Sequence, residues 1–229
     1  MTLSDTTSTE TTLQRYKSFN VSLDNKIAHV QFSRPEAMNS MDKAFWVELP
    51  LCMRDIENNS DARVIVISST GKHFSAGMDL GVFSDGSTMP PSKDPARMAE
   101  GLRRLVLQLQ ATLSSLEEIR LPVLTAIQGG CIGGALDLVC AADSRYCTAD
   151  AYFTIKETEL GMTADVGTLQ RLPKLIPAGI VKELAFTGRK FSADEAQQFG
   201  LVNKVYADQE SMLAGVMEIA AQIAANSPL

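Results

Sequence analysis

The segment Gln128-Gly-Gly-Cys-Ile-Gly-Gly-Ala-Leu-Asp-Leu138 decides how this chain is interpreted, because it places a glycine-rich turn between two apolar elements. The run Leu121–Ile127 before it is typical of a buried strand, and Ala135–Ala142 after it is typical of a short buried helix. Glycine lets a backbone approach a ligand closely, and a helix N-terminus offers free N–H groups. Glycine turns more often serve chain reversal, so this segment alone leaves both interpretations open.

A second segment repeats the order of strand and glycine loop. The β-branched run Arg63–Ser68 predicts a buried strand, and Phe74-Ser-Ala-Gly-Met-Asp-Leu80 follows it closely. Two such loops that face each other can form a pair of amides that hold one anionic oxygen. The two loops are therefore compatible with a two-amide site, and chain reversal stays open for each of them.

The remaining patterns predict an α/β chain. Short strands at 19–23 and 26–32 flank Asp24-Asn25, which is typical of a tight hairpin. Two more short strands are expected at 145–148 and 152–155. Helical spacing of apolar residues predicts helices at 41–56, 95–116, 168–175, 180–186, 193–198 and 210–225. The composition of 81–95 and 156–167 predicts loops.

Length and composition predict one ordinary globular domain. The 229 residues are 45% hydrophobic and 21% charged, and no apolar run approaches the roughly 20 residues that cross a bilayer. The net charge of -6 offers no general attraction to phosphate backbones, so a nucleic-acid partner is not expected. Residues 1–15 are expected to form a disordered leader, and the composition of 1–12 lacks the features of a secretory or mitochondrial signal.

Cysteine and histidine give little support to metal or triad chemistry. The four cysteines contain no CxxC pair and lie among small or apolar residues, which predicts buried reduced thiols. The two histidines fall in different segments, so neither a His-rich metal site nor a Ser-His-Asp triad is expected.

Four acidic residues are candidates for proton transfer. Asp137 lies in an otherwise apolar run, so it should be either neutral or held by nearby donors. Glu157, Glu159 and Asp165 lie in a predicted loop, where acids are usually solvated. Carboxylates beside two free amides are what proton transfer next to a thioester requires, and this combination favours a catalytic interpretation.

From about Tyr16 to the end, these motifs resemble the crotonase, or enoyl-CoA hydratase/isomerase, superfamily. The resemblance implies a crotonase fold over residues 16–229, in which a spiral of repeated ββα units is followed by helices. It also implies that the backbone N–H groups of Met78 and Gly134 form the oxyanion hole. Further residues are expected near the coenzyme A part of the substrate, namely Arg34, Ala37, Met38, Ala76 and Gly77.

The acids resemble one branch of this superfamily, the Δ3,5-Δ2,4-dienoyl-CoA isomerases of fatty-acid β-oxidation. Ordinary hydratases carry glutamates at the positions of Asp137 and Glu157, and a small residue near Asp165. Moving a 3,5-diene to the 2,4 position removes a proton at C2 and adds one at C6. The resemblance implies that Glu157 is the C2 base, Asp165 the C6 donor and Asp137 a supporting acid, with no cofactor, because coenzyme A enters as part of the substrate.

Other interpretations stay open at this stage. The same motifs fit enoyl-CoA hydration or Δ3,Δ2-enoyl-CoA isomerisation, and a non-catalytic binding protein with this fold, including an RNA-binding one, is a different class. The resemblance implies homotrimers or homohexamers, with contact surfaces expected near 180–186 and 210–225. Family members continue past Leu229 into further helices, which the chain is expected to lack. The compartment is not fixed: a bacterial protein would be cytoplasmic, and a C-terminal peroxisomal signal would lie outside this chain.

Overall fold

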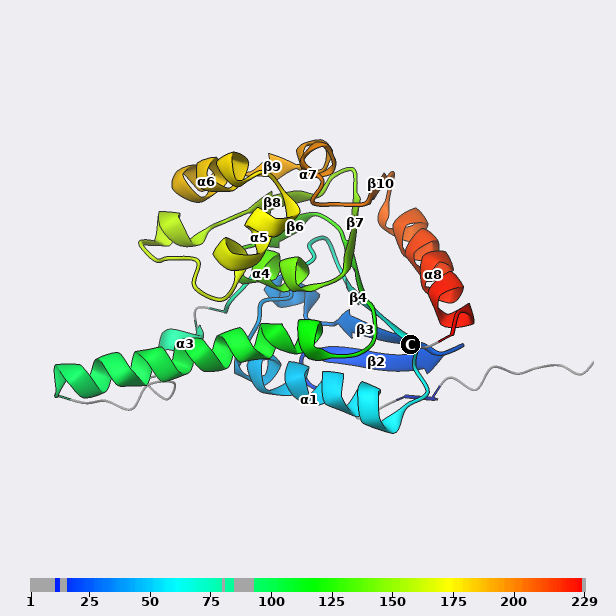
Figure 1. The fold of residues 1–229 in the computed structure, drawn as a ribbon, viewed down its shortest axis with the longest axis horizontal. Coiled ribbons are helices and arrows are strands. Elements are labelled where there is room, and N and C mark those ends of the chain that lie inside the picture. The colour runs from blue at the N-terminus through cyan, green and yellow to red at the C-terminus, as the bar shows by residue number, and fades with distance from the viewer. Residues whose placement is uncertain (1–10, 13–15, 80, 85–92, 228–229) are drawn as a thin grey trace, which may run out of the picture.

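Two β-sheets form the centre of the protein, and the computed structural model describes residues 11–12, 16–79, 81–84 and 93–227. The strands are β1 (Thr11–Thr12), β2 (Phe19–Asp24), β3 (Ile27–Phe32), β4 (Val64–Ser69), β5 (Val123–Ile127), β6 (Gly130–Ile132), β7 (Ser144–Thr148), β8 (Tyr152–Thr154), β9 (Phe191–Ser192) and β10 (Lys204–Tyr206). The larger sheet has the order β1-β2-β3-β4-β5-β7-β10, and the smaller has the order β6-β8-β9 (Figure 1).

Helices follow the strands in a regular order. They are η1 (Pro35–Ala37), α1 (Lys43–Asn59), α2 (Gly81–Ser84), α3 (Pro95–Glu118), α4 (Gly134–Ala141), η2 (Glu157–Leu160), α5 (Thr168–Leu175), α6 (Ala178–Thr187), α7 (Ala193–Phe199) and α8 (Gln209–Ala225). The chain passes from β5 in the larger sheet to β6 in the smaller sheet and then to α4, and it repeats this path through β7, β8 and α5.

Isolated bridges bring the earlier turns of the chain into the same pattern. Met41, just before α1, pairs with Met78, and Ser75 pairs with Cys131 of β6. Each turn therefore adds one segment to the larger sheet and one beside the smaller sheet before it enters a helix. This arrangement confirms the predicted α/β class and the predicted spiral of ββα units.

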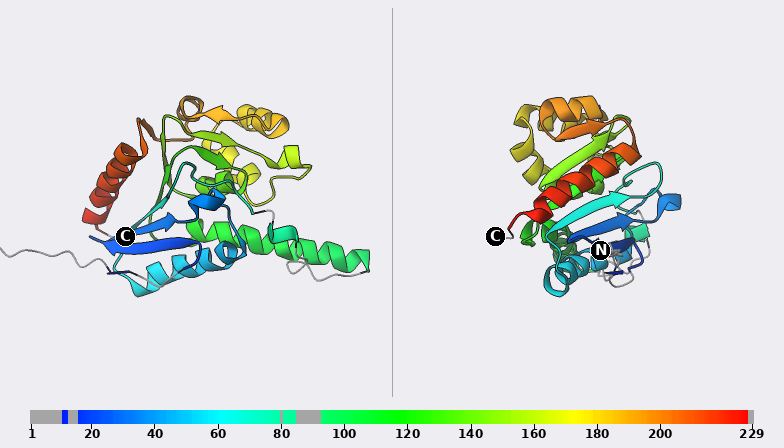
Figure 2. Two further views of the ribbon diagram at one scale, coloured as in Figure 1. Left: turned by 180° about the vertical axis from the view of Figure 1, so that it is seen from behind. Right: turned by 90° about the vertical axis from the view of Figure 1, so that its right-hand side faces the viewer.

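The larger sheet is covered on both faces. Alternate residues of β4 point to opposite sides: Ile65 and Ile67 join the main core with α1, α3 and α4, whereas Val64 and Val66 pack against α8. Burial on both faces explains the continuous β-branched sequence of this strand. Figure 2 shows α8 lying across the strands. The expectation that 210–225 offers its apolar face to a partner is wrong, because that face covers the sheet.

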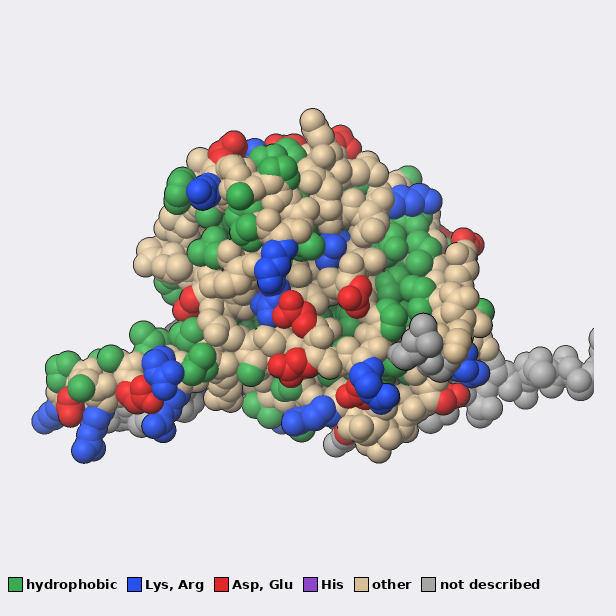
Figure 3. Space-filling model, in the orientation of Figure 1, with side chains coloured by type: hydrophobic (Ala, Val, Ile, Leu, Met, Phe, Trp, Pro, Cys, Tyr) green, Lys and Arg blue, Asp and Glu red, His purple; other side chains and the backbone are tan. Residues whose placement is uncertain are grey.

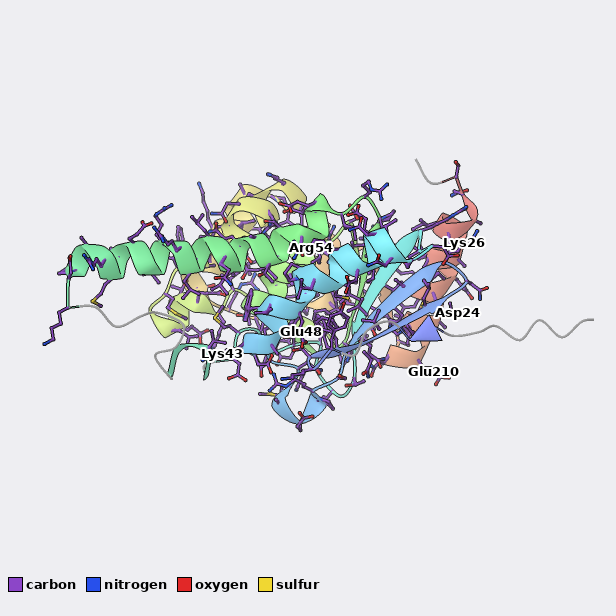
Figure 4. The ribbon with its side chains drawn as sticks, turned by 90° about the horizontal axis from the view of Figure 1, so that it is seen from below. Asp24, Lys26, Lys43, Glu48, Arg54 and Glu210 are labelled. Carbon is purple, nitrogen blue, oxygen red and sulfur yellow. The ribbon has the colours of Figure 1, made fainter. Side chains whose placement is uncertain are left out.

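Two long helices lie side by side below the sheet, as Figure 4 shows. Helix α1 begins after Asp42, whose carboxylate accepts the N–H of Phe45 at 2.9 Å. The carboxylate of Glu48 on α1 accepts the N–H groups of Lys17 and Ser18 and so ties the chain before β2 to the helix. The N-terminal end of α3 projects beyond the body of the protein with acidic and basic side chains mixed along it (Figure 3).

Several local predictions need correction. Residues 130–132, predicted as part of a turn, form β6, and 157–160, predicted as loop, form η2. Thr11–Thr12, within the predicted leader, pairs with β2, and the rest of that leader, 1–10 and 13–15, lies outside the described residues. The predicted loop 81–95 begins with α2, and 85–92 lies outside the described residues. Tertiary pairing explains the new strands, which are too short to show a pattern of their own.

Two predictions about side chains and membranes can be compared directly with the structure. All four cysteines are buried and free, which confirms the prediction of reduced thiols. Within the described ranges, no helix is both long enough and apolar enough to cross a bilayer.

Candidate active site

A cleft of about 380 Å³ lies between α3, η2 and the start of α4. Helix α3 supplies apolar side chains to it, from Leu102, Leu105, Val106 and Leu109. The opposite wall contains Met78, Gly134, Glu157 and Asp165. Together with Ala76, five of the predicted site residues line one cavity. An apolar wall facing a few polar groups is the usual construction of a small-molecule site.

Strand pairing leaves the amide of Met78 free. Met41 donates its N–H to Gly77 O at 2.8 Å and accepts the N–H of Asp79 at 3.1 Å. Because successive peptide groups of an extended segment point in opposite directions, the N–H of Met78 faces away from Met41. Among the described residues it donates to no backbone carbonyl.

Among the described residues the amide of Gly134 also donates to no backbone carbonyl, for a different reason. Gly134 is the first residue of α4, and the first N–H groups of a helix have no partner inside it. Its neighbour Gly133 donates instead to Thr154 O at 3.0 Å. A Cβ built on Gly134 would lie 3.5 Å from Met78 N, so the two predicted oxyanion donors are neighbours in space.

Glycine is required where the two loops meet. Gly77 has φ of 80°, and a Cβ on it would lie 2.3 Å from Ile132 O and 3.0 Å from Gly134 N. Any side chain here would collide with the backbone that carries the second amide. The glycines of these loops therefore allow the close approach that brings the two amides together.

Glu157 lies next to the amide pair. A Cβ on Gly133 would lie 3.0 Å from Glu157 Oε1, so the carboxylate packs against the start of α4. Its Oε2 atom is buried and has no hydrogen-bond partner among the described residues. Burial raises the pKa of Glu157, the N–H groups of Glu157 and Lys156 oppose this shift, and the charge of Asp165 adds to it.

Asp137 is fully buried beneath this wall. Its Oδ1 accepts the backbone N–H of Thr168, whereas Oδ2 has no partner among the described residues. Burial raises the pKa of Asp137 to about 7; hydrogen bonding from Thr168 opposes the shift and the charge of Glu157 increases it. The sequence predicted that Asp137 is either neutral or held by nearby donors. Both apply in part, because one oxygen has a donor and the raised pKa favours the protonated, neutral form.

Asp165 differs from the other two acids because it is exposed at the cleft wall. Among the described residues, its carboxylate accepts no hydrogen bond; only its main-chain oxygen does, from Gln110 Nε2. The three predicted acids thus differ in exposure, from the buried Asp137 through the half-buried Glu157 to the exposed Asp165.

The residues expected near coenzyme A lie together but differ in exposure and in the contacts that they already make. Ala76 lines the cleft, and its N–H bonds Met38 O at 2.9 Å, which brings the two predicted segments side by side. Met38 is 52% exposed, and Ala37 precedes it at the end of η1. The Arg34 guanidinium is already engaged, donating to Ser40 O at 2.8 Å and lying 3.1 Å from an Asp42 carboxylate oxygen and 3.9 Å from one of Asp79.

Sequence reasoning missed residues that act on the site from its edge. Gln110 and Arg171 hold the main chain beside Asp165, and Lys156 lines the cleft. The apolar spacing of the predicted helix 95–116 was the available signal for Gln110, because it indicates which face of α3 packs inward. The spacing does not indicate that this face lines a cleft.

Comparison with known proteins identifies the family. The enoyl-CoA hydratase/isomerase family model matches residues 22–229. The chain belongs to this family. A solved enoyl-CoA hydratase/isomerase from Xanthobacter autotrophicus Py2 has the same fold, with a TM-score of 0.84 at 25% identity, over 93% of this chain and 76% of that one.

Two curated proteins are more similar to this chain in sequence. The mitochondrial Delta(3,5)-Delta(2,4)-dienoyl-CoA isomerase of Rattus norvegicus is 47% identical over 93% of this chain. The peroxisomal protein of the same name from Arabidopsis thaliana is 41% identical over 95% of this chain and 80% of its own length. The chain spans 66% of the length of the rat relative, about two thirds.

Proposed function

We propose that this protein isomerises 3,5-dienoyl-CoA thioesters to 2,4-dienoyl-CoA thioesters in fatty-acid β-oxidation. The observation that carries the proposal is that two free amides and two carboxylates, those of Glu157 and Asp165, line one apolar cleft. The names of the rat and Arabidopsis relatives support the same activity.

The first step of the proposed reaction is proton removal from C2. Glu157 takes this proton, and the electron pair of the broken C–H bond spreads over the thioester carbonyl, C2, C4 and C6. The N–H groups of Met78 and Gly134 stabilise the negative oxygen that forms. The raised pKa of Glu157 suits a base that must hold the proton afterwards.

The second step is proton delivery at C6. Asp165 gives a proton to C6, and the C5–C6 and C3–C4 double bonds become single. New double bonds form at C4–C5 and C2–C3, and the thioester carbonyl forms again. Glu157 ends protonated and Asp165 ends ionised, so exchange with solvent must reset both. The exposure of Asp165 supports this reset.

Asp137 has a supporting role in this scheme. With a pKa of about 7 it adds less negative charge beneath Glu157 than a fully ionised acid would. Ionisation of Glu157 is therefore opposed less strongly when Asp137 holds its proton.

A pair of substrates tests the proposal against its nearest rivals. The protein should convert a 3,5-dienoyl-CoA to a 2,4-dienoyl-CoA, seen by the ultraviolet absorbance of a diene conjugated with the thioester. Hydration of a 2-enoyl-CoA instead removes the absorbance of its one conjugated double bond. Δ3,Δ2-isomerisation is measured with a 3-enoyl-CoA, which has a single double bond. Faster turnover of either mono-unsaturated thioester than of the 3,5-diene would contradict the proposal, and no turnover with any of the three would favour a binding protein.

The proposal also covers the oligomeric state: the chain assembles into homotrimers, which can pair as hexamers. Support comes from an apolar surface beside η2 and α6, where Phe186 is 77% exposed, Leu160 is 52% exposed and Met162 is 44% exposed. Sedimentation should give three or six times the 24.8 kDa chain mass. Sedimentation as a single chain would contradict this part of the proposal.

A further inference from the structure

The main chain around Asp165 is held by side chains of other elements. Gln110 Nε2 on α3 donates to Asp165 O, and Arg171 Nη1 on α5 donates to Val166 O at 3.2 Å. The N–H of Thr168 donates to the buried carboxylate of Asp137. These three contacts fall on successive parts of one short loop, so its backbone is fixed from both sides.

Arg171 is itself firmly placed. Its Nη2 donates to Ser114 Oγ at 2.9 Å and its Nε to Glu117 Oε2 at 2.8 Å, both on α3, and its side chain is 11% exposed. The guanidinium occupies the space beside Gly167, whose φ is 139°; a Cβ there would lie 1.7 Å from Arg171 Nη1. The glycine allows the arginine to reach the loop carbonyl, and α3 and α5 are linked through it.

The same loop turns Asp165 toward the cleft. Ala164 and Val166 are 3% and 4% exposed and anchor the loop in the core, while the residue between them is exposed and lines the cleft. Because the Asp165 carboxylate accepts no hydrogen bond among the described residues, its position depends on the backbone that carries it. That backbone position depends in turn on Gln110 and Arg171.

We infer that Gln110 and Arg171 are positioning residues that determine which carbon of the intermediate receives the proton delivered in the second step. This inference rests on the proposed function, in which Asp165 is the donor. Loss of the C2 proton leaves electron density on C2, C4 and C6. Return of a proton to C2 restores the substrate, delivery to C4 gives a 2,5-diene, and delivery to C6 gives the 2,4-diene. The loop position selects among these carbons.

The test measures the product ratio in deuterated water. The variants Gln110→Met and Arg171→Lys remove the amide donor and the guanidinium fork while they keep similar volume and, for Arg171→Lys, the charge. A 3,5-dienoyl-CoA is incubated with each enzyme, and magnetic resonance measures deuterium at C2, C4 and C6. Since a misplacement of about 1 Å can cost about 100-fold in rate, we expect the ratio of C6 to C2 deuteration to fall about tenfold or more.

Matched variants separate positioning from general damage. Gln108→Met changes the same residue type on the exposed side of α3, and Arg120→Lys changes an arginine that pairs with Glu57 on the surface. Both should keep the wild-type ratio. A ratio does not depend on how much of a variant is folded, so partial unfolding of Arg171→Lys leaves the test valid.

The outcomes distinguish this inference from the proposed function. A wild-type ratio in both Gln110→Met and Arg171→Lys, or rates at all carbons that fall in parallel, would overturn the positioning role while isomerisation by the wild type stands. Absence of the 2,4-diene with wild-type protein would overturn the proposed function and this inference with it.

Discussion

The two ends of the cleft are built in different ways. At the amide end, Met78 and Gly134 are placed by strand pairing and by the start of a helix, so main-chain geometry does the positioning. At the other end, Asp165 is placed by a loop that side chains from α3 and α5 hold. The amide end should therefore tolerate most side-chain changes outside its acids and glycines, whereas the Asp165 end should respond to changes in side chains that never touch the substrate.

The largest expected effect on the reaction rate comes from replacing Glu157, the proposed general base at the amide end. Glu157→Gln should lower the rate of C2 proton exchange by about 10² to 10⁴, the usual contribution of a general base. Binding of the CoA thioester should change little, because the amides remain. Glu159→Gln is the matched control, since Glu159 is an acid of the same η2 segment paired with Lys156. Equal loss in both variants would mean that charge, and not the base, is responsible.

The next effect tests whether main-chain geometry governs this end. Gly77→Ala places a Cβ 2.3 Å from Ile132 O at a φ of 80°, so the loop must shift and carry the Met78 amide with it. Loss of one oxyanion donor costs about 10² to 10³ in kcat. Single-turnover kinetics with a 3,5-dienoyl-CoA measures this. A variant that folds and keeps the wild-type kcat would show that the amide is not used.

A smaller effect concerns the buried acid that joins the two ends. Folded Asp137 has a pKa of about 7 and the unfolded side chain one near 3.8, so the unfolded state loses its proton first as pH rises. The contribution of Asp137 is complete below about pH 4, and the free energy of unfolding should fall as pH rises from about 4 to about 7. Asp137→Asn keeps an acceptor for Thr168 and should remove this slope, a difference of about 1 to 4 kcal/mol by urea unfolding. An unchanged slope would mean that another group causes it.

The smallest effect concerns a glycine outside both ends. Gly101 lies inside α3, and a Cβ on it would meet nothing within 4 Å. Gly101→Ala should raise the free energy of unfolding by up to about 1 kcal/mol through helix propensity and leave the isomerase rate unchanged. Thermal unfolding measures the first and the substrate assay the second. A fall in rate would show that the projecting end of α3 moves during the reaction.

Local sequence patterns and the family resemblance predicted different parts of this site. The strand at 64–69, the hairpin and both glycine loops follow from local patterns, because alternation, β-branching and glycine report directly on the backbone. The grouping of Glu157 with Asp165 depended on the family resemblance, since acids in a loop carry no sign of what they face. Strands β6, β9 and β10 and the contacts of Arg171 escaped prediction, because each depends on a partner distant in sequence.

The central claim, that two separate acids serve two carbons, is tested most directly by deuterium exchange in Asp165→Asn beside Glu157→Gln. With a 3,5-dienoyl-CoA in deuterated water, Asp165→Asn should still exchange the C2 proton while it forms almost no 2,4-diene, and Glu157→Gln should do neither. Formation of the 2,4-diene by Asp165→Asn at the wild-type rate would contradict the account.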